Sequence, residues 1–370
     1  MINIFSPYLG KLEKKNVNEC LKTNWISSQG NFISEFEGSL ANYHKSKYCV
    51  VTSSCTTAIH LSLLCCGIKP GDEVICSNLS FIAPANMILL SGAKPVFVDI
   101  ERLSPNIDPE KIEKKITKKT KAILVVHQFG HPCEMSKINK IAKKYNLKVI
   151  EDNAESIGAK FKNEIIGTKS DASTLSFFAN KIITTGEGGA IITNNKKIAD
   201  SARVLRDHGM SKKTRYKFIK LGFNYRMTNL QAAIGCAQIK NIKKILEARD
   251  SQFDLYKKLL INNKNISFFE QKKNYKPVHW LTTIILKHKN RRKSLIKFLL
   301  NEGIESRIMI PPIHKSNHFK SKYNLNNSLF KNSIDLSERG LHLPSSLNLS
   351  KKQIEFICSK ISKFFKEKNN

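Results

Sequence analysis

The chain has 370 residues, 41% of them hydrophobic, which is enough for one large domain with a smaller appendage. No apolar run approaches the roughly 18 residues of a membrane span, and the N-terminal segment lacks the basic and apolar parts of a secretory signal, so we expect a cytosolic protein without a membrane span. The 62 Lys and Arg against 30 Asp and Glu give a net charge of +32, but the lysines are spread along the whole chain, which favours a compositional bias over a nucleic-acid-binding arm.

From residue 48 onward, short apolar runs alternate with helical segments. The runs are rich in Val and Ile and read as strands, and the segments between them include predicted helices at Ala58–Cys66 and Ser136–Tyr145. This alternation is typical of an α/β domain whose mostly parallel sheet is covered by helices on both faces. The predicted strands are Tyr48–Thr52, Glu73–Cys76, Lys94–Asp99, Ala122–His127, Lys148–Glu151 and Thr174–Phe177.

The second half of the chain continues this pattern and then changes character. We expect a strand at Ala190–Thr193, an amphipathic helix at Ile198–Arg206 and a long helical region at Met227–Lys258 that links two domains. From about Phe268 onward the pattern indicates a smaller α+β domain, so we divide the chain into a large domain, residues 1–245 with an N-terminal arm, and a small domain, residues 246–370. The elements expected in the small domain are a strand at Leu281–Lys287 and helices at Arg292–Asn301 and Lys351–Phe365.

An acidic pair, Glu151 and Asp152, ends one of the predicted strands. The carboxyl ends of parallel strands are where open α/β sheets bind their ligands. A polar strand terminus with no further role is the alternative for Asp152. The pair is therefore a candidate site only in combination with other residues.

Lys181 follows another predicted strand and precedes a glycine-rich turn, Gly186–Gly189. Lysine is normally a solvated surface residue. Between Phe177, Phe178, Ile182 and Ile183 its amine would be poorly solvated, as an imine-forming lysine requires. A surface lysine that extends its charge into water is the alternative.

A third segment, Ser53–Thr57, connects a predicted strand to a predicted helix. Its hydroxyl groups and the free amides of the helix N-terminus suit a phosphate, although such residues also serve as ordinary helix caps. In chain order, a phosphate turn, an Asp and a Lys with a Gly-rich turn together predict a pyridoxal 5′-phosphate site.

The nine cysteines show no paired C-x-x-C spacing of the kind that binds zinc or performs redox chemistry. We therefore expect reduced and mostly buried thiols and no metal site. They lie at positions 20, 49, 55, 65, 66, 76, 133, 236 and 358.

Almost from end to end, the chain resembles the DegT/StrS group of nucleotide-sugar aminotransferases. The resemblance implies a pyridoxal-phosphate enzyme of fold type I, the aspartate-aminotransferase-like fold, with a large α/β domain and a smaller C-terminal α+β domain. The matching segments are Asn24–Gly30 with Phe36 and Glu37, Gly71–Val74, Pro95–Asp99, Glu151–Asp152, Ser176–Gly189 and Gly222–Asn229.

The resemblance also implies roles for individual residues. Lys181 would be the catalytic lysine that forms an imine with the cofactor and then moves the proton between substrate and cofactor, while Asp152 would hold the ring nitrogen. Phe81 would stack on the ring, or else be a core phenylalanine, and Glu155 would lie beside the phenolic oxygen. The phosphate would be bound by Ser54, Cys55, Thr56 and Ser176, and by Asn224 of the neighbouring subunit of a homodimer.

One residue departs from the family pattern. Cys55 stands where relatives usually have the Gly of a Gly-Thr pair. A side chain at this position is expected to tighten the phosphate turn.

Within the family, the likeness points to members that aminate C4 of GDP-4-keto-6-deoxy-D-mannose for surface polysaccharide, including O-antigen. L-Glutamate would then be the amino donor and 2-oxoglutarate its product. The segments that carry this likeness are Trp25–Ser28, Ser176–Lys181, Asn224–Asn229, His279–Thr283 and Gly303–Arg307. The candidates for contact with the sugar nucleotide are Trp25, Arg226, His279, Trp280, Arg307 and His314, each of which has a purely structural alternative such as interdomain packing or an ion pair.

Three other functions are compatible with a fold of this kind. The substrate could instead be a UDP- or dTDP-linked 4-keto-6-deoxy-glucose. Related 3-dehydratases carry His at the lysine position, so Lys181 disfavours dehydration. A non-catalytic binding or sensor protein of the same fold would have no need of both Asp152 and Lys181.

Overall fold

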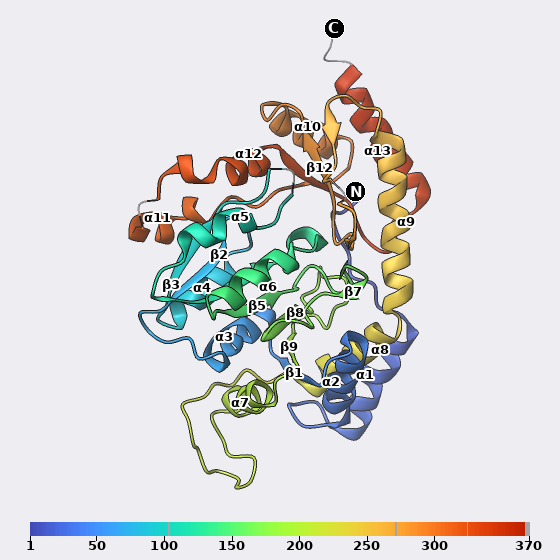
Figure 1. The fold of residues 1–370 in the computed structure, drawn as a ribbon. Helices are drawn as coiled ribbons and strands as arrows, with labels where there is room; N and C mark the ends of the chain where they lie inside the picture. Colours follow the sequence, from blue (N-terminus) through green and yellow to red (C-terminus); the bar gives the residue numbers. More distant parts are fainter. Residues whose placement is uncertain (103, 271, 324, 367–370) are drawn as a thin grey trace.

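A seven-stranded sheet forms the centre of the larger part of the molecule (Figure 1). The computed structural model describes residues 1–102, 104–270, 272–323 and 325–366. The strand order is β1-β9-β8-β5-β4-β2-β3; only β9 runs antiparallel to its neighbours, so the prediction of an α/β fold with a mostly parallel sheet is confirmed. The strands are β1 (Tyr48–Thr52), β2 (Glu73–Ser77), β3 (Lys94–Val98), β4 (Thr120–Val126), β5 (Lys148–Asp152), β8 (Ala172–Ser176) and β9 (Gly189–Thr193).

Helices cover both faces of this sheet because its strands are apolar on both sides. Val50 and Ile191 face α3 and α7, whereas Val51 and Ile192 face the opposite layer, to which α2 and α8 belong. Their side chains are fully buried. The helices are α1 (Lys11–Thr23), α2 (Asn31–His44), α3 (Cys55–Cys65), α4 (Ala83–Leu90), α5 (Pro109–Ile112), α6 (Met135–Lys144), α7 (Lys196–Arg206) and α8 (Asn229–Lys240).

The long helical region predicted at Met227–Lys258 is confirmed, although it is not one continuous helix. The structure has two helices, α8 and α9 (Ile242–Leu260), which are separated at Asn241. At Asn241 φ is −99° and ψ is 2°, so the backbone leaves the helical region for one residue. A break of one residue leaves the apolar periodicity on either side intact, which is why the pattern did not show it.

The smaller C-terminal part is built around a four-stranded antiparallel sheet of order β10-β12-β14-β13. The N-terminus joins it, because Ile2 bridges to Ile304 and the Ile4 amide donates to Glu305 Oε2 at 2.7 Å. The division of the chain at residue 245 stays a prediction, and that residue lies within α9. The elements are β10 (Ile266–Ser267), β12 (Thr282–Leu286), β13 (Arg307–Ile308), β14 (Gly340–Leu343), α10 (Arg291–Asn301), α12 (Lys331–Arg339) and α13 (Lys351–Lys366).

Several short elements have no counterpart among the predicted ones. A three-stranded sheet of order β11-β6-β7 lies beside the main sheet, and residues Ile313, Phe319 and Phe330 of the C-terminal part pack into the same core cluster as β2. These elements are β6 (Lys160–Phe161), β7 (Glu164–Ile165), β11 (Tyr275–Lys276), α11 (Asn317–Tyr323) and the 3₁₀ turns Glu113–Lys115, Gln128–Gly130, Ile313–Lys315 and Asn327–Phe330.

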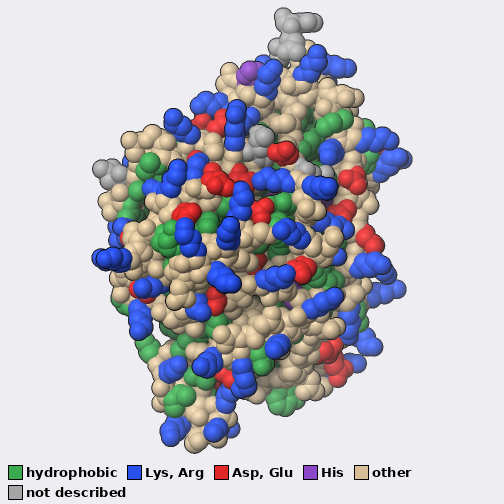
Figure 2. Space-filling view, viewed as in Figure 1, with side chains coloured by type: hydrophobic (Ala, Val, Ile, Leu, Met, Phe, Trp, Pro, Cys, Tyr) green, Lys and Arg blue, Asp and Glu red, His purple; other side chains and the backbone are tan. Residues whose placement is uncertain are grey.

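The surface is rich in lysine without a single dense patch on the face shown. Figure 2 shows Lys and Arg side chains over the whole of that face, with Asp and Glu between them. Among the described residues, no helix has the length and apolar character needed to cross a membrane. All nine cysteines carry free thiols, and seven of them are buried, as expected.

Candidate active site

A cavity of about 400 Å³ opens at the carboxyl edge of the seven-stranded sheet. Segments that follow β1, β4, β5 and β8 form one wall, as expected for strands that end at the same edge. The opposite wall comes from the smaller part of the chain, through Trp280, Arg307 and His342. Ten of the residues predicted from the sequence line this cavity: Ser54, Cys55, Thr56, Phe81, Asp152, Glu155, Ser176, Lys181, Trp280 and Arg307.

The turn between β1 and α3 is organised by a reciprocal helix cap. Ser54 Oγ accepts from the Thr57 amide at 3.2 Å, and Thr57 Oγ1 accepts from the Ser54 amide at 3.2 Å. The amides at the first turn of a helix have no partner inside the helix and carry its positive end. Thr56 and the backbone of Cys55 therefore offer an anion site at the wall of the cavity.

Gly189, the first residue of β9, lets this strand pass directly beneath the turn. A Cβ atom at this position would lie 2.4 Å from Cys55 N and 2.4 Å from the Ser54 carbonyl carbon. No side chain fits there without a shift of the backbone. Glycine at position 189 is thus explained by a close backbone approach to the anion-binding turn.

Asp152 ends β5 and points into the cavity, with only 4% of its surface exposed. Its Oδ1 accepts from the Ala154 amide at 2.8 Å, and the Cys55 thiol lies 3.8 Å from the same oxygen. Burial raises the pKa of Asp152 from 3.8 to about 6, although the Ala154 amide and the Lys181 ammonium both act against that rise. A cationic ring nitrogen in the cavity would favour the charged form of this carboxyl.

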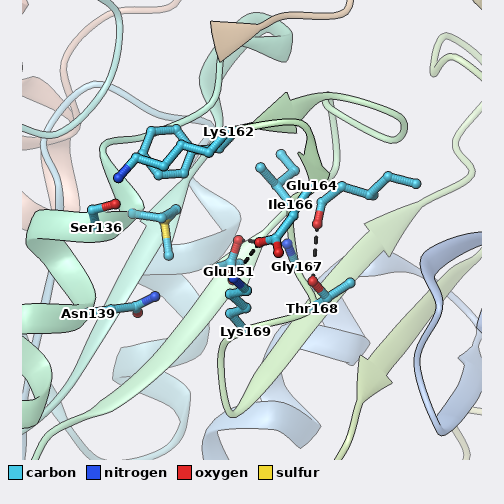
Figure 3. Close-up of a pocket in the computed structure, with 12 residues that line it drawn as sticks. Ser136, Asn139, Glu151, Lys162, Glu164, Ile166, Gly167, Thr168 and Lys169 are labelled. Atoms are coloured by element: carbon cyan, nitrogen blue, oxygen red, sulfur yellow. Dashed lines mark hydrogen bonds and ion pairs between the residues drawn. The ribbon is translucent and has the colours of Figure 1, made fainter. Parts of the chain in front are cut away.

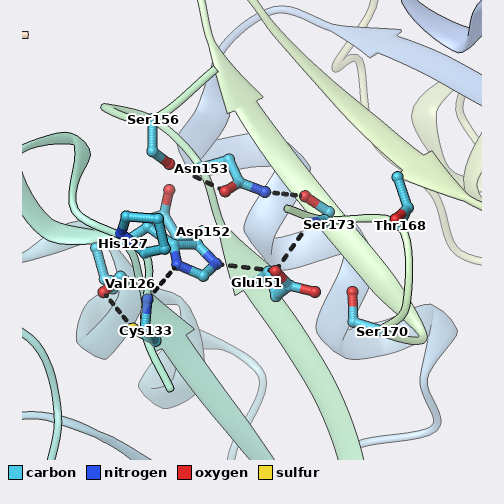
Figure 4. A network of polar contacts seen from close by, with 12 residues as sticks. Val126, His127, Cys133, Glu151, Asp152, Asn153, Ser156, Thr168, Ser170 and Ser173 are labelled. Carbon is cyan, nitrogen blue, oxygen red and sulfur yellow. Dashed lines mark hydrogen bonds and ion pairs between the residues drawn. The ribbon is translucent and has the colours of Figure 1, made fainter. Parts of the chain in front are cut away.

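The side chain of Glu151 points to the other face of the sheet, because successive strand residues alternate. Figure 4 shows its hydrogen bond with His127, at 2.8 Å. The Cys133 amide donates to His127 Nδ1 at 2.9 Å, so Nε2 carries the proton and donates to Glu151. This buried network fixes the ends of β4 and β5, and the His127 amide also donates to the Asp152 carbonyl at 3.1 Å.

Glu151 also faces a second, smaller hollow of about 100 Å³ between α6 and residues 162–169 (Figure 3). There the Gly167 amide donates to Glu151 Oε2 at 2.9 Å. Of the acidic pair, Asp152 alone therefore lines the larger cavity, and Glu151 supports the sheet behind it.

Lys181 lies in the loop after β8, with its amine at the cavity wall. Its Nζ is 3.4 Å from Glu155 Oε1. The second carboxylate oxygen of Glu155 accepts from the Phe129 amide at 2.8 Å, so Glu155 is anchored by the backbone of another strand end. Asp152 and Lys181 thus share one cavity, as the sequence predicted.

Phe81 belongs to the same cavity and is 61% exposed. A core phenylalanine, the alternative raised for it, would be buried. An exposed aromatic face over a cavity is instead available for stacking on a planar ring.

Three of the predicted residues lie on the surface of the chain, outside the cavity. Trp25 is 56% exposed in the loop between α1 and α2. Asn224 is exposed, and its backbone bridges to Asp207. Arg226 pairs with Asp207 at 2.5 Å and donates to Ser28 Oγ at 3.0 Å. Their predicted roles in binding stay predictions.

Two predicted histidines also lie outside the cavity. His279 stacks on Phe253 with ring centroids 3.7 Å apart, and burial lowers its pKa to about 3. His314 bonds with Asn78 and, at 2.9 Å, with Asn327, and burial lowers its pKa. In this chain both side chains are engaged in packing, and a role in substrate contact stays a prediction.

Residues that the sequence reasoning did not select complete the cavity wall. Phe129 has a left-handed backbone, with φ of 54°, and His342 comes from β14 at the far end of the chain. The only local signal for Phe129 is its place after a predicted strand, where functional side chains gather. His342 reaches the site through the pairing of β14 with β12 and β13, which no local pattern shows.

The chemistry of these groups fits pyridoxal phosphate. The cavity offers a helix N-terminus with hydroxyl groups for the phosphate, a buried carboxyl for the ring nitrogen, an exposed aromatic ring and an amine. These four functions come from Thr56, Asp152, Phe81 and Lys181, which lie on four different segments of one cavity wall.

Comparison with known proteins agrees with this assignment. The model of the DegT/DnrJ/EryC1/StrS aminotransferase family matches residues 7–362. A GDP-perosamine synthase of Escherichia coli O157:H7 is 40% identical over 99% of each chain, and one of Caulobacter vibrioides is 43% identical over 85% of each. The structure of Helicobacter pylori PseC, an aminotransferase of pseudoaminic acid biosynthesis, superposes with a TM-score of 0.94 at 29% identity over 99% of each chain. The chain therefore belongs to the DegT/DnrJ/EryC1/StrS aminotransferase family, and its cofactor is pyridoxal 5′-phosphate.

Proposed function

We propose that this enzyme transfers the amino group of L-glutamate to C4 of GDP-4-keto-6-deoxy-D-mannose and so forms GDP-perosamine for a surface polysaccharide such as O-antigen. The full-length likeness to relatives named GDP-perosamine synthase supports the substrate. The observation that carries the reaction type is the meeting of Asp152 and Lys181 in one cavity. The enzyme would act in the cytoplasm, where nucleotide sugars are made.

Lys181, Asp152 and Phe81 of the cavity have different roles toward the cofactor. When bound, the cofactor supplies a carbonyl that accepts an amine and a ring that withdraws electrons. Lys181, whose amine lies at the cavity wall, would hold the cofactor through that carbonyl and would serve as the acid and base that moves the proton. Asp152 would accept a hydrogen bond from the ring nitrogen and favour its protonated form, and Phe81 would offer an aromatic face to the ring.

The phosphate would be held by the first turn of α3 and by two hydroxyl groups. Ser54 shapes the turn, and Thr56 and Ser176 line the cavity beside it. Cys55 contributes its amide, while its thiol lies against Asp152 at 3.8 Å and Thr174 at 3.6 Å. Glu155 would lie next to the phenolic oxygen.

On the substrate side, Arg307 and Trp280 are best placed in this chain, since both line the cavity. A guanidinium suits the diphosphate of a sugar nucleotide or the carboxylate of glutamate. Trp25, Arg226, His279 and His314 are proposed as more distant contacts.

We also propose that two copies share their active sites in a homodimer. The segment between α7 and α8 projects from the body of the chain (Figure 1) and exposes apolar side chains. Contiguous exposed apolar residues are typical of a protein interface. Asn224, at the base of this segment, would then reach the phosphate of the neighbouring copy. The exposed residues are Tyr216, Phe218, Ile219 and Leu221.

The test is spectroscopic and enzymatic. The purified protein should be yellow, L-glutamate should bleach the band, and Lys181→Ala should be colourless while remaining folded by circular dichroism. A colourless wild-type protein would favour a non-catalytic binding protein.

Amination assays with GDP-, UDP- and dTDP-linked 4-keto-6-deoxy sugars would then identify the substrate. We expect the GDP sugar to be preferred, and a clear preference for another nucleotide would overturn the proposed substrate but not the reaction type.

A further inference from the structure

The amine of Lys181 lies between two partners from different parts of the chain. Its Nζ is 3.4 Å from Glu155 Oε1 and 4.2 Å from the centroid of the Trp280 ring. An ammonium within about 6 Å of a tryptophan ring is attracted by its negative face. Lys181 has only 14% of its side chain exposed, so water screens both contacts weakly.

Trp280 is held firmly in this position. Its Nε1–H donates to the carbonyl of Asn180, the residue before Lys181, at 2.5 Å. Its ring stacks nearly parallel to that of Phe129, with 6.4 Å between centroids and an interplanar angle of 11°. With 7% exposure, Trp280 is fixed on one side by the lysine loop and on the other by Phe129.

Phe129 connects the two partners of the amine. Its ring stacks on Trp280, and its amide donates to Glu155 Oε2 at 2.8 Å. The ring and the carboxylate that contact Lys181 are therefore both positioned by Phe129, whose backbone is left-handed. This arrangement is a preformed site for an ammonium group.

We infer that Trp280 is a positioning residue, which together with Glu155 holds the Lys181 amine whenever that amine is not bonded to the cofactor. The inference rests on the proposed role of Lys181. In transamination, the amino group of the donor takes the place of the lysine, which leaves as a free amine and must stay within reach for the return step. The site keeps the amine at the cavity wall without a new rotamer search in each half-reaction.

The test compares two forms of the cofactor on the apoprotein. Pyridoxal phosphate bonds to Lys181 and draws the amine away from Trp280, whereas pyridoxamine phosphate has no carbonyl and leaves the amine in place. Any contact of Trp280 with the cofactor ring is the same for both compounds. The dissociation constant of pyridoxal phosphate divided by that of pyridoxamine phosphate therefore reports only the contact of Trp280 with the Lys181 amine. Calorimetric titration measures both constants and needs no turnover.

Trp280→Leu should lower this ratio about 3- to 30-fold, because the free amine loses its partner and imine formation no longer gives up that contact. Trp280→Phe, which keeps a weaker aromatic face, should lower the ratio about two- to threefold and carries the test if the Leu variant does not fold. The matched control is Phe269→Leu. Phe269 also stacks on Phe129, at 6.2 Å, but unlike Trp280 it is not among the residues that line the cavity.

The outcomes separate the two proposals. A lower ratio in the Trp280 variants with a change of less than twofold in Phe269→Leu supports the role of Trp280. An unchanged ratio, or equal shifts in Trp280→Leu and Phe269→Leu, overturns it while leaving the proposed function intact. A wild-type protein that binds neither compound overturns the proposed function itself.

Discussion

Replacing Asp152 by asparagine should make the apoprotein more stable at neutral pH while weakening its hold on the cofactor. Asp152 is almost fully buried, and burial raises its pKa from 3.8 to about 6. The folded apoprotein therefore keeps a buried charge at neutral pH that the unfolded chain exposes to water. An asparagine can still accept from the Ala154 amide, and it carries no charge.

The size and the sign of the effect follow from the two pKa values. Below pH 3.8 the carboxyl is protonated in both the folded and the unfolded chain, so it costs no stability. Between pH 3.8 and about 6 the unfolded chain loses the proton first, and above pH 6 the full cost is present. A shift of about two pKa units corresponds to about 3 kcal/mol at pH 7.5, as an order of magnitude.

Urea unfolding of the apoprotein between pH 5 and pH 8, followed by circular dichroism, measures this difference. We expect the free energy of unfolding of Asp152→Asn to be about 2 to 3 kcal/mol higher than that of the wild type at pH 7.5, and the difference to be clearly smaller at pH 5. Pyridoxal phosphate should raise the melting temperature of the variant less than that of the wild type, because the ring nitrogen loses its charged partner.

Asp200→Asn is the matched control. Asp200 is a solvent-exposed carboxylate whose pKa is lowered to about 2 by hydrogen bonds from Lys196 and Lys212, so its neutralisation should bring no gain in stability. A variant at Asp152 that is no more stable than the wild type, or whose advantage does not shrink as the pH falls, would refute the reasoning.

Three further predictions concern the walls of the cavity. Gly189→Ala should lower the free energy of unfolding, measured in urea, by about 1 to 3 kcal/mol and weaken pyridoxal phosphate binding, because its methyl group would meet the backbone of the anion-binding turn. The control is Gly38→Ala, where nothing lies within 4 Å and the change should stabilise helix α2. Similar effects of the two changes would contradict this account. Phe81→Leu should leave the melting temperature nearly unchanged, because the side chain is exposed, yet raise the dissociation constant of pyridoxal phosphate about fivefold by calorimetry; a large loss of stability would show that Phe81 is a core residue. Burial raises the pKa of the Cys55 thiol well above 9.0, so iodoacetamide at pH 8 should modify it at least about tenfold more slowly in the native protein than in urea. Peptide mass spectrometry measures both rates, and equal rates would exclude a buried thiol.

The main sheet was predictable because its strands are short segments between polar turns and, apart from β8, contain Val or Ile. β1 was predicted with its observed bounds, and the others shifted by one or two residues at their ends. The carboxyl edge of the sheet brings Asp152 and the turn after β1 together without further information, since parallel strands end on one side. Lys181 lies at the same edge of the sheet for the same reason, because it follows β8, which is parallel to β5.

Other parts of the site depend on contacts between distant segments, which local patterns do not contain. His342 reaches the cavity through an antiparallel pairing with Thr283, across the small sheet. Phe129 depends on a left-handed backbone at a position that is not glycine. The break at Asn241 was hidden because the apolar period on each side continues unchanged.

The pairing of Ile2 with Ile304 sets an order of events during synthesis. Ile2 finds its partner only after some 300 more residues have been added, whereas the seven strands of the main sheet can pair as soon as residue 193 is available. The large sheet should thus form while the chain is still growing, with the extreme N-terminal segment left unpaired. Bulky fusions ahead of Ile2 would then slow the docking of this segment beside Ile304 and Glu305, in the smaller part of the chain that carries Trp280 and Arg307.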